Sequence, residues 1–166
     1  MERLLLEMID YFQGDAKRVQ HLIKVYEFAR LIGREEGLEL ERQEILEAAA
    51  LVHDIGIHRA EQKFGSSSGR LQEQEGPALA EVMLTRLGFC SSLIQRVCFL
   101  VGHHHTYSAI DGLDFQILAE ADCLVNFYED QVSYEGILAA MEKVFHTKTG
   151  KKICRTMFLQ PVRQED

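Results

Sequence analysis

Apolar residues recur along the chain at the three- to four-residue spacing of amphipathic helices. The opening stretch, MERLLLEMIDYF, interleaves acidic and apolar positions and predicts a helix over about 1–12. A long second helix is expected next, with Asp15 as its N-cap and Gly37 close to its end. The apolar run AAALVHDIG then closes a third helix over about 42–54.

The second half of the chain continues the helical pattern after an irregular segment. Residues 55–75 have Gly and Ser clustered in their middle and predict a long loop, whereas Pro77 suits the first turn of a helix that stops at Gly88. No run alternates with period two. We therefore expect an all-α, compact bundle of about six to seven helices, ending in a last short helix. The later helical patterns cover about 91–103, 114–129, 133–146 and, for the short helix, 150–159.

Composition narrows the class of protein. A length of 166 residues suits one domain spanning 1–166, and no segment has the roughly 20 apolar residues that cross a membrane. The acidic, amphipathic start is unlike a signal peptide, so we expect a cytoplasmic protein. Four scattered cysteines form no C-x-x-C pair and are interpreted as reduced thiols. A net charge of −8 argues against binding to a nucleic-acid polymer.

Three predicted helices each carry one potential metal ligand on an apolar face. His21 shares a stripe with Val25 and Ile32, His53 follows a run of apolar residues, and Asp122 lies among apolar neighbours in ILAEADCLVN. Charged groups are rarely buried unless they are paired or bind a metal. Imidazoles with carboxylates suit Zn, Fe, Mn or Ni, and the absence of Cys from the set argues against a structural zinc site.

Each of these residues also has a simpler interpretation when taken alone. His21 or His53 could be an ordinary core histidine, and Asp122 could be the buried partner of an arginine. Asp54 could merely end a helix. A helical protein with purely structural polar residues in its core is therefore one alternative, although the joint occurrence of the four residues weakens it.

The ordered set of His21, then His53 and Asp54 in LVHDIG, then Asp122, resembles the HD-domain superfamily of metal-dependent phosphohydrolases. The resemblance covers about residues 15–130 and leaves 131–166 as a C-terminal helical extension. It implies a helical bundle in which His21, His53, Asp54 and Asp122 bind a divalent metal. Candidate metals are Mn, Fe, Ni, Zn, Co and Mg.

Two further features resemble HD proteins that bind a second metal. The run LVGHHH places His103 and His104 where such proteins carry a tandem His, with His105 the extra residue. Glu75 precedes a Gly-Pro and an apolar helix, a place where many HD proteins carry a ligating His. Glu75, His103 and His104 are therefore candidate ligands of a second metal. A solvated helix end and an acidic residue near a helix N-terminus are the alternatives.

The resemblance departs from the family where a phosphate-binding Lys often follows HDIG, because Ile57 and His58 stand there instead. A cation for the phosphate would then come from Lys63 or Arg70 in the irregular segment, or from Arg18, one turn before His21. Ser67, in a Ser-rich stretch, could offer hydroxyl and backbone N–H groups, unless that stretch is an ordinary surface loop.

The implied function is hydrolysis of a small phosphate ester, with a nucleotide as the expected substrate, by metal-activated water. Either a phosphomonoesterase or a phosphodiesterase fits. Asp54 would orient or deprotonate the water, and His103 or His104 would stabilise charge or protonate the leaving oxygen. The alternative is a non-catalytic regulatory module that binds metal and nucleotide. The apolar faces of the first and last helices are candidates for pairing two copies in a homodimer.

Overall fold

The computed structural model describes residues 1–161, which form nine α-helices and no strand. Three helices that pack against one another make the centre of the molecule: α2 (Ala16–Glu35), α3 (Leu40–Val52) and α7 (Leu113–Glu129). The predicted all-α class is confirmed. The other helices are α1 (Glu2–Tyr11), α4 (Ile57–Phe64), α5 (Gly69–Leu87), α6 (Ser91–Val101), α8 (Tyr134–Val144) and α9 (Lys148–Cys154), with short 3-10 and π segments at Tyr107–Ala109 and Arg155–Leu159.

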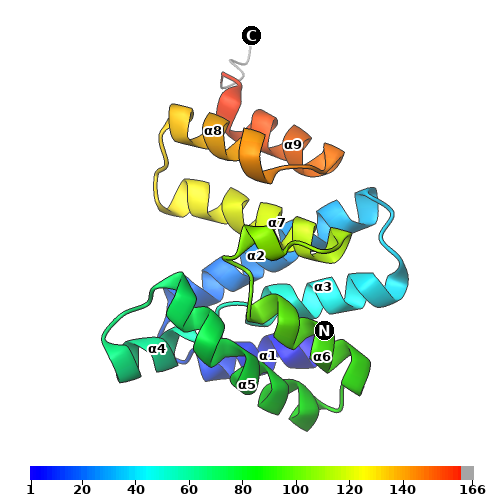
Figure 1. The fold of residues 1–166 in the computed structure, drawn as a ribbon, viewed down its shortest axis with the longest axis vertical. Helices are drawn as coiled ribbons and strands as arrows, with labels where there is room; N and C mark the ends of the chain where they lie inside the picture. Colours follow the sequence, from blue (N-terminus) through cyan, green and yellow to red (C-terminus); the bar gives the residue numbers. More distant parts are fainter. Residues whose placement is uncertain (162–166) are drawn as a thin grey trace.

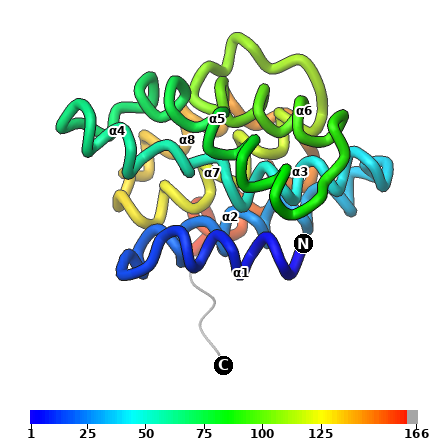
Figure 2. Tube along the Cα trace, turned by 90° about the horizontal axis from the view of Figure 1, so that it is seen from below, coloured from blue at the N-terminus to red at the C-terminus, as the bar shows by residue number. Residues whose placement is uncertain are grey.

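The remaining helices cover two sides of this central group. Helices α8 and α9 lie together at one end of the molecule and pack on α7 (Figure 1). Helices α5 and α6 pair with each other at the other end, where α6 packs on α3. Helix α1 lies beside α3 and α5 and runs along the lower edge of Figure 2. The central helices are therefore enclosed, and side chains at their contacts are removed from water.

The core explains why polar residues in α3 and α7 are informative. Every residue from 48 to 52 in α3 is fully buried, and α7 is buried along most of its length. Burying one large aliphatic side chain stabilises a fold by roughly 1.5–3 kcal/mol, whereas burying an unpaired charge costs much more. A His or Asp held on these helices must therefore have partners, and those partners define the candidate site.

The described residues form more helices than the six to seven predicted, and α4, within residues 55–75, is the helix that no predicted helical pattern covers. Most of this segment is helical: it contains α4 and the first two turns of α5. The sequence pattern missed α4 because this helix has only eight residues and buries only Ala60, so its apolar positions are too few to mark a helix by themselves. The start of α5, GRLQEQE, is similarly polar.

Pro77 lies inside α5, not in its first turn as predicted. A proline there cannot donate a hydrogen bond to the carbonyl one turn earlier. Its ring packs beside Gly102 at the end of α6, where an added Cβ would lie 3.2 Å from Cγ of Pro77. Packing between α5 and α6 thus accommodates the proline within the helix.

Candidate metal centre

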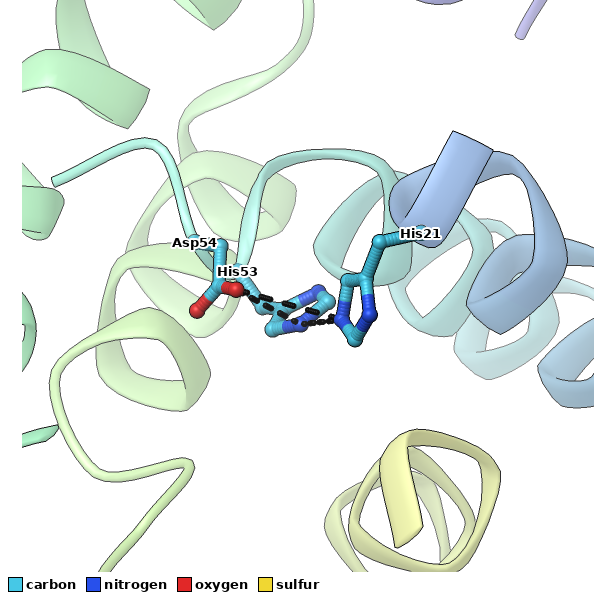
Figure 3. Close-up of side chains that lie close together, drawn as sticks. All are labelled: His21, His53 and Asp54. Carbon is cyan, nitrogen blue, oxygen red and sulfur yellow. Dashed lines mark hydrogen bonds and ion pairs between the residues drawn. The ribbon is translucent and has the colours of Figure 1, made fainter. Parts of the chain in front are cut away.

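Four side chains from the central helices converge at one point. His21 comes from α2, His53 and Asp54 from the end of α3, and Asp122 from α7. Nε2 of His21 lies 3.4 Å from Nε2 of His53 and 3.2 Å from Oδ1 of Asp122. Oδ2 of Asp54 lies 3.8 Å from both imidazole nitrogens (Figure 3). All four residues predicted as ligands are thus brought together.

The end of α3 explains how neighbouring residues reach the same point. Helical turns follow Val52 without regular α-helical bonding: Ile55 N–H donates to the Val52 carbonyl, and Ile57 N–H donates to that of Asp54. This tight turn lets His53 and Asp54 face one site instead of diverging by the 100° per residue of an α-helix.

Gly56 completes that turn because helix α5 passes very close to it. A Cβ on Gly56 would lie 2.5 Å from the Gln72 carbonyl oxygen and 2.7 Å from the Gly76 nitrogen. Any larger residue would push α5 away from the turn. The glycine of HDIG therefore fixes the position of the His53–Asp54 dyad against α5.

The electrostatics of the cluster favour a bound cation. Burial would lower the pKa of His21, but its hydrogen bond to Asp122 and the charges of Asp122 and Asp54 raise it to about 9. Burial would also lower the pKa of His53, but the neighbouring charges of Asp54 and Asp122 outweigh burial and raise it. Burial would raise the pKa of both aspartates, yet the imidazoles outweigh it and lower both values. The carboxylates thus draw positive charge into the cluster.

The donor set also fits a divalent metal in its chemistry. Within residues 1–161, no arginine or lysine pairs with Asp54 or Asp122, so imidazoles are the only groups able to carry positive charge that pair with these two carboxylates. Ligand atoms of His21, His53 and Asp54 lie within 4.8 Å of one another. Oδ1 of Asp122 lies 3.2 and 3.7 Å from the two imidazole nitrogens. Imidazole nitrogens and carboxylate oxygens are ligands that Zn, Mn, Fe and Ni accept. Metal binding would displace the protons that the imidazoles otherwise hold.

A second group of potential ligands adjoins the first. Oδ1 of Asp54 lies 3.2 Å from Nε2 of His104, and Asp54, His104 and His105 each offer an atom within 4.8 Å of the others. His103, by contrast, stacks on Phe99 and bonds through Nδ1 to the Phe99 carbonyl. The pair at the site is therefore His104 and His105, not the expected His103 and His104, because the turn after α6 directs His103 elsewhere.

Glu75 and Lys63, expected to bind a second metal and a phosphate respectively, bind each other. Nζ of Lys63 lies 2.6 Å from Oε2 of Glu75, and Nε of Arg59 lies 3.0 Å from the same oxygen. Glu75 belongs to neither group of potential ligands. The pairing depends on α4, whose turn carries Arg59 and Lys63 to the side of α5.

A pocket of about 320 Å³ opens onto His21 and Asp54. Arg18 and Ser67, two of the residues expected to bind substrate, line it, whereas Arg70 is exposed at the start of α5 and Lys63 is not among the lining residues. Arg18 is held by Asp15 and by Glu61, 2.7 Å away. The complete lining is Asp15, Lys17, Arg18, His21, Asp54, Ile57, Ser67, Asn126, Glu129 and Asp130.

Two residues that the sequence analysis did not single out contact the ligands directly. Nδ2 of Asn126 donates to Oδ1 of Asp122 at 2.9 Å, and Oε2 of Glu129 lies 3.1 Å from Nδ1 of His21. Both follow Asp122 at offsets of four and seven residues, which places all three on one face of α7. That spacing of polar residues along an apolar helix was the signal that could have found them.

The family model for the HD domain matches residues 18–144, from the first helical turn of α2 to the end of α8. The chain belongs to the HD-domain family. HD domains are metal-dependent, in agreement with the His and Asp group described above. The matched range contains all four converging residues and both neighbouring histidines.

A solved structure shares the fold of this HD domain. It is a predicted HD superfamily hydrolase from an uncultured Thermotogales bacterium, 23% identical, with a TM-score of 0.68 over 96% of this chain and 85% of the other. No protein in the comparison with curated sequences matches this chain. Among the described residues, no helix combines the length and the apolarity that crossing a bilayer requires.

Proposed function

We propose that this HD-domain protein hydrolyses a small phosphate ester, with a nucleotide as the expected substrate. The observation that carries the proposal is the convergence of His21, His53, Asp54 and Asp122 beside a pocket that also contains Arg18. A site with paired imidazoles and carboxylates next to a fixed guanidinium suits a substrate that bears a phosphate.

His21, His53, Asp54 and Asp122 would hold one divalent metal, and Asp54, His104 and His105 would hold a second where two are bound. A divalent cation supplies Lewis acidity, which makes water more acidic and draws charge from a phosphoryl oxygen. Mn, Fe, Ni, Zn, Co and Mg are the candidates. The carboxylates of Asp54 and Asp122 are ionised by their imidazole neighbours, so both are ready to bind.

The chain's own residues then divide the work of hydrolysis. Asp54 faces both groups of ligands through its two oxygens and would orient the attacking water and accept its proton. The water oxygen bonds to phosphorus as the ester P–O bond breaks. Where only one metal is bound, Nε2 of His104 stays free of metal beside Asp54 and would return a proton to the leaving oxygen. His103 is a less direct candidate for that proton transfer because its ring stacks on Phe99 and it belongs to neither group of potential ligands.

Substrate binding would rest on the pocket residues. Arg18, anchored by Asp15 and Glu61, presents its guanidinium to the pocket and would neutralise the phosphate together with Ser67. Lys63 is paired with Glu75, and Arg70 is exposed at the start of α5. Neither lines the pocket, so each would reach a substrate only at the rim of the site. A pocket of this size favours a mononucleotide or similar small ester over a polymer.

The test is a substrate screen with matched variants. Protein purified without a metal-affinity tag is loaded with each candidate metal and given phosphomonoesters, nucleoside monophosphates, and cyclic and dinucleoside phosphates. We expect turnover that falls at least about a hundredfold in His53→Ala and Asp54→Ala, since the loss of even a partner of a ligand costs 10–100-fold. His146→Ala removes an exposed imidazole beyond α8 and should not change turnover.

Two outcomes would contradict the proposal. Equal turnover in wild type and His53→Ala would assign the activity to another site. Tight binding of metal and nucleotide with no turnover would favour the regulatory module instead.

A further inference from the structure

The imidazoles of the candidate metal centre differ in the group that contacts Nδ1, the ring nitrogen that faces away from the other ligands. Nδ1 of His53 lies 3.0 Å from the Ala50 carbonyl oxygen, and Nδ1 of His104 lies 2.8 Å from that of Val101. Each of these partners is a backbone group three residues earlier in the same segment. His21 has a side-chain partner instead, the carboxylate of Glu129, which is 108 residues later in the chain.

Glu129 is itself held in place by a cation. Its Oε2 faces His21, and its Oε1 accepts a hydrogen bond from Nζ of Lys24. Lys24 lies one turn after His21 on α2, so two residues of the same helix contact the two carboxylate oxygens of Glu129. The Glu129 side chain is only 13% exposed, which limits screening of these contacts by solvent. The last residue of α7 is thus fixed against the His21 turn of α2.

This arrangement has a direct effect on the nitrogen that faces the candidate metal. When Nδ1–H donates to a carboxylate, the ring is held in one orientation, and Nε2 presents its lone pair to a metal. A charged acceptor holds the ring more strongly than a backbone carbonyl does and makes Nε2 a better ligand. Nε2 of His21 is the atom that points at Asp122, His53 and Asp54.

We propose that Glu129, braced by Lys24, is a positioning residue that orients His21 for metal binding. The inference rests on the proposed metal centre and assigns a role to residues outside its ligand set. Glu129 acts through His21 and does not need to contact the metal or the substrate.

The test compares Glu129→Gln with Asp130→Asn. Both variants replace a carboxylate by an amide beside the same pocket, but Asp130 is exposed and has no contact with His21 among the described residues. The probe is Zn²⁺, with its affinity measured by competition with a chromophoric chelator. We expect Glu129→Gln to weaken Zn²⁺ binding about 10–100-fold and Asp130→Asn to change it by no more than about twofold.

Two further variants separate geometry from charge. Glu129→Asp keeps the charge but withdraws it from Nδ1 of His21, so its Zn²⁺ affinity should fall as well. Lys24→Met leaves Glu129 able to accept from His21 and should cost less than Glu129→Gln. Urea unfolding should show that each metal-free variant is still folded under the conditions of the Zn²⁺ measurement, so that a lower affinity reports the metal centre and not loss of the fold.

Equal Zn²⁺ affinity in Glu129→Gln and Asp130→Asn would overturn the role of Glu129, as would a wild type that binds no Zn²⁺. Phosphoester hydrolysis by the same preparations tells this failure apart from failure of the proposed function. Zn²⁺ binding that depends on Glu129 in a protein that hydrolyses nothing would support the positioning role and remove the proposed activity. If wild type hydrolyses a phosphate ester but its Zn²⁺ affinity does not depend on Glu129, the proposed function stands and the positioning role of Glu129 falls.

Discussion

Two of the buried carboxylates of helix α7, Glu120 and Asp122, differ in their partners. Glu120 is fully buried and accepts hydrogen bonds from Gln116, from the Thr147 hydroxyl and from the backbone N–H groups of His146 and Thr147. Asp122 is 6% exposed and meets imidazole nitrogens of other helices together with an asparagine amide. Two residues correspond to about 200° of helix rotation, so the carboxylates face opposite sides of α7.

The difference shows that burial of a charge does not by itself indicate a functional site. The donors around Glu120 are amide and hydroxyl groups of the chain, which keep their protons. Through them, Glu120 links the connection between α8 and α9 to α7. Asp122 is surrounded by groups that can exchange a proton for a metal ion. The kind of partner, not the degree of burial, therefore separates the structural carboxylate from the candidate ligand.

The largest expected effect is loss of metal binding in Asp122→Ala. Removing a direct ligand should weaken Zn²⁺ binding by more than about a hundredfold, beyond the cost of losing a ligand's partner. The metal-free protein should be about 1–2 kcal/mol less stable than wild type, because His21 and His53 lose a buried carboxylate partner while the repulsion on Asp54 becomes weaker. Chelator competition and urea unfolding measure the two quantities. Zn²⁺ affinity within tenfold of wild type would exclude Asp122 as a ligand.

The opposite result is expected for Glu120→Ala. Removing this carboxylate leaves several buried donors without an acceptor, and each can cost about 1–3 kcal/mol. We expect a loss of about 3 kcal/mol in the free energy of unfolding, measured with urea, while the Zn²⁺ affinity of the folded protein stays within about twofold. If Glu120→Ala weakened Zn²⁺ binding as strongly as Asp122→Ala, the distinction between the two carboxylates would fail.

Much of the framework of the site was predictable from the sequence because strong helical periodicity reports burial directly. The apolar stripes around His21 and His53 predicted that both side chains would point inward, and the structure brings them to one point with Asp54 and Asp122. Glu120 and Asp122, however, lie in the same apolar string and look alike in sequence. The apolar stripe drew attention to Asp122 but did not distinguish it from Glu120, and the resemblance to HD proteins made that distinction.

The remaining features depend on contacts that no local pattern records. Lys63 meets Glu75 only because α4 forms where a loop was expected. The turn after α6 decides that His105, and not His103, lies beside His104. Glu129 reaches His21 across 108 residues, and a periodic polar face on α7 was the sole local hint.

The smallest expected effect concerns Asp114, a third buried carboxylate of α7, whose partners are the permanent cations Arg96 and Arg42. Burial would raise the pKa of Asp114, but the two arginines lower it below its ordinary value. Its contribution to stability is therefore present above about pH 4 and is lost as the pH falls through the lower pKa of the folded state. Asp114→Asn should be about 1–2 kcal/mol less stable than wild type at pH 7 in urea, and this difference in stability should become smaller by pH 3.

The control is Asp111→Asn, which removes a half-exposed partner of Arg96 and should cost about 0.5 kcal/mol or less. A gap of constant size from pH 7 to pH 3 would mean that Asp114 acts by packing and not by its charge.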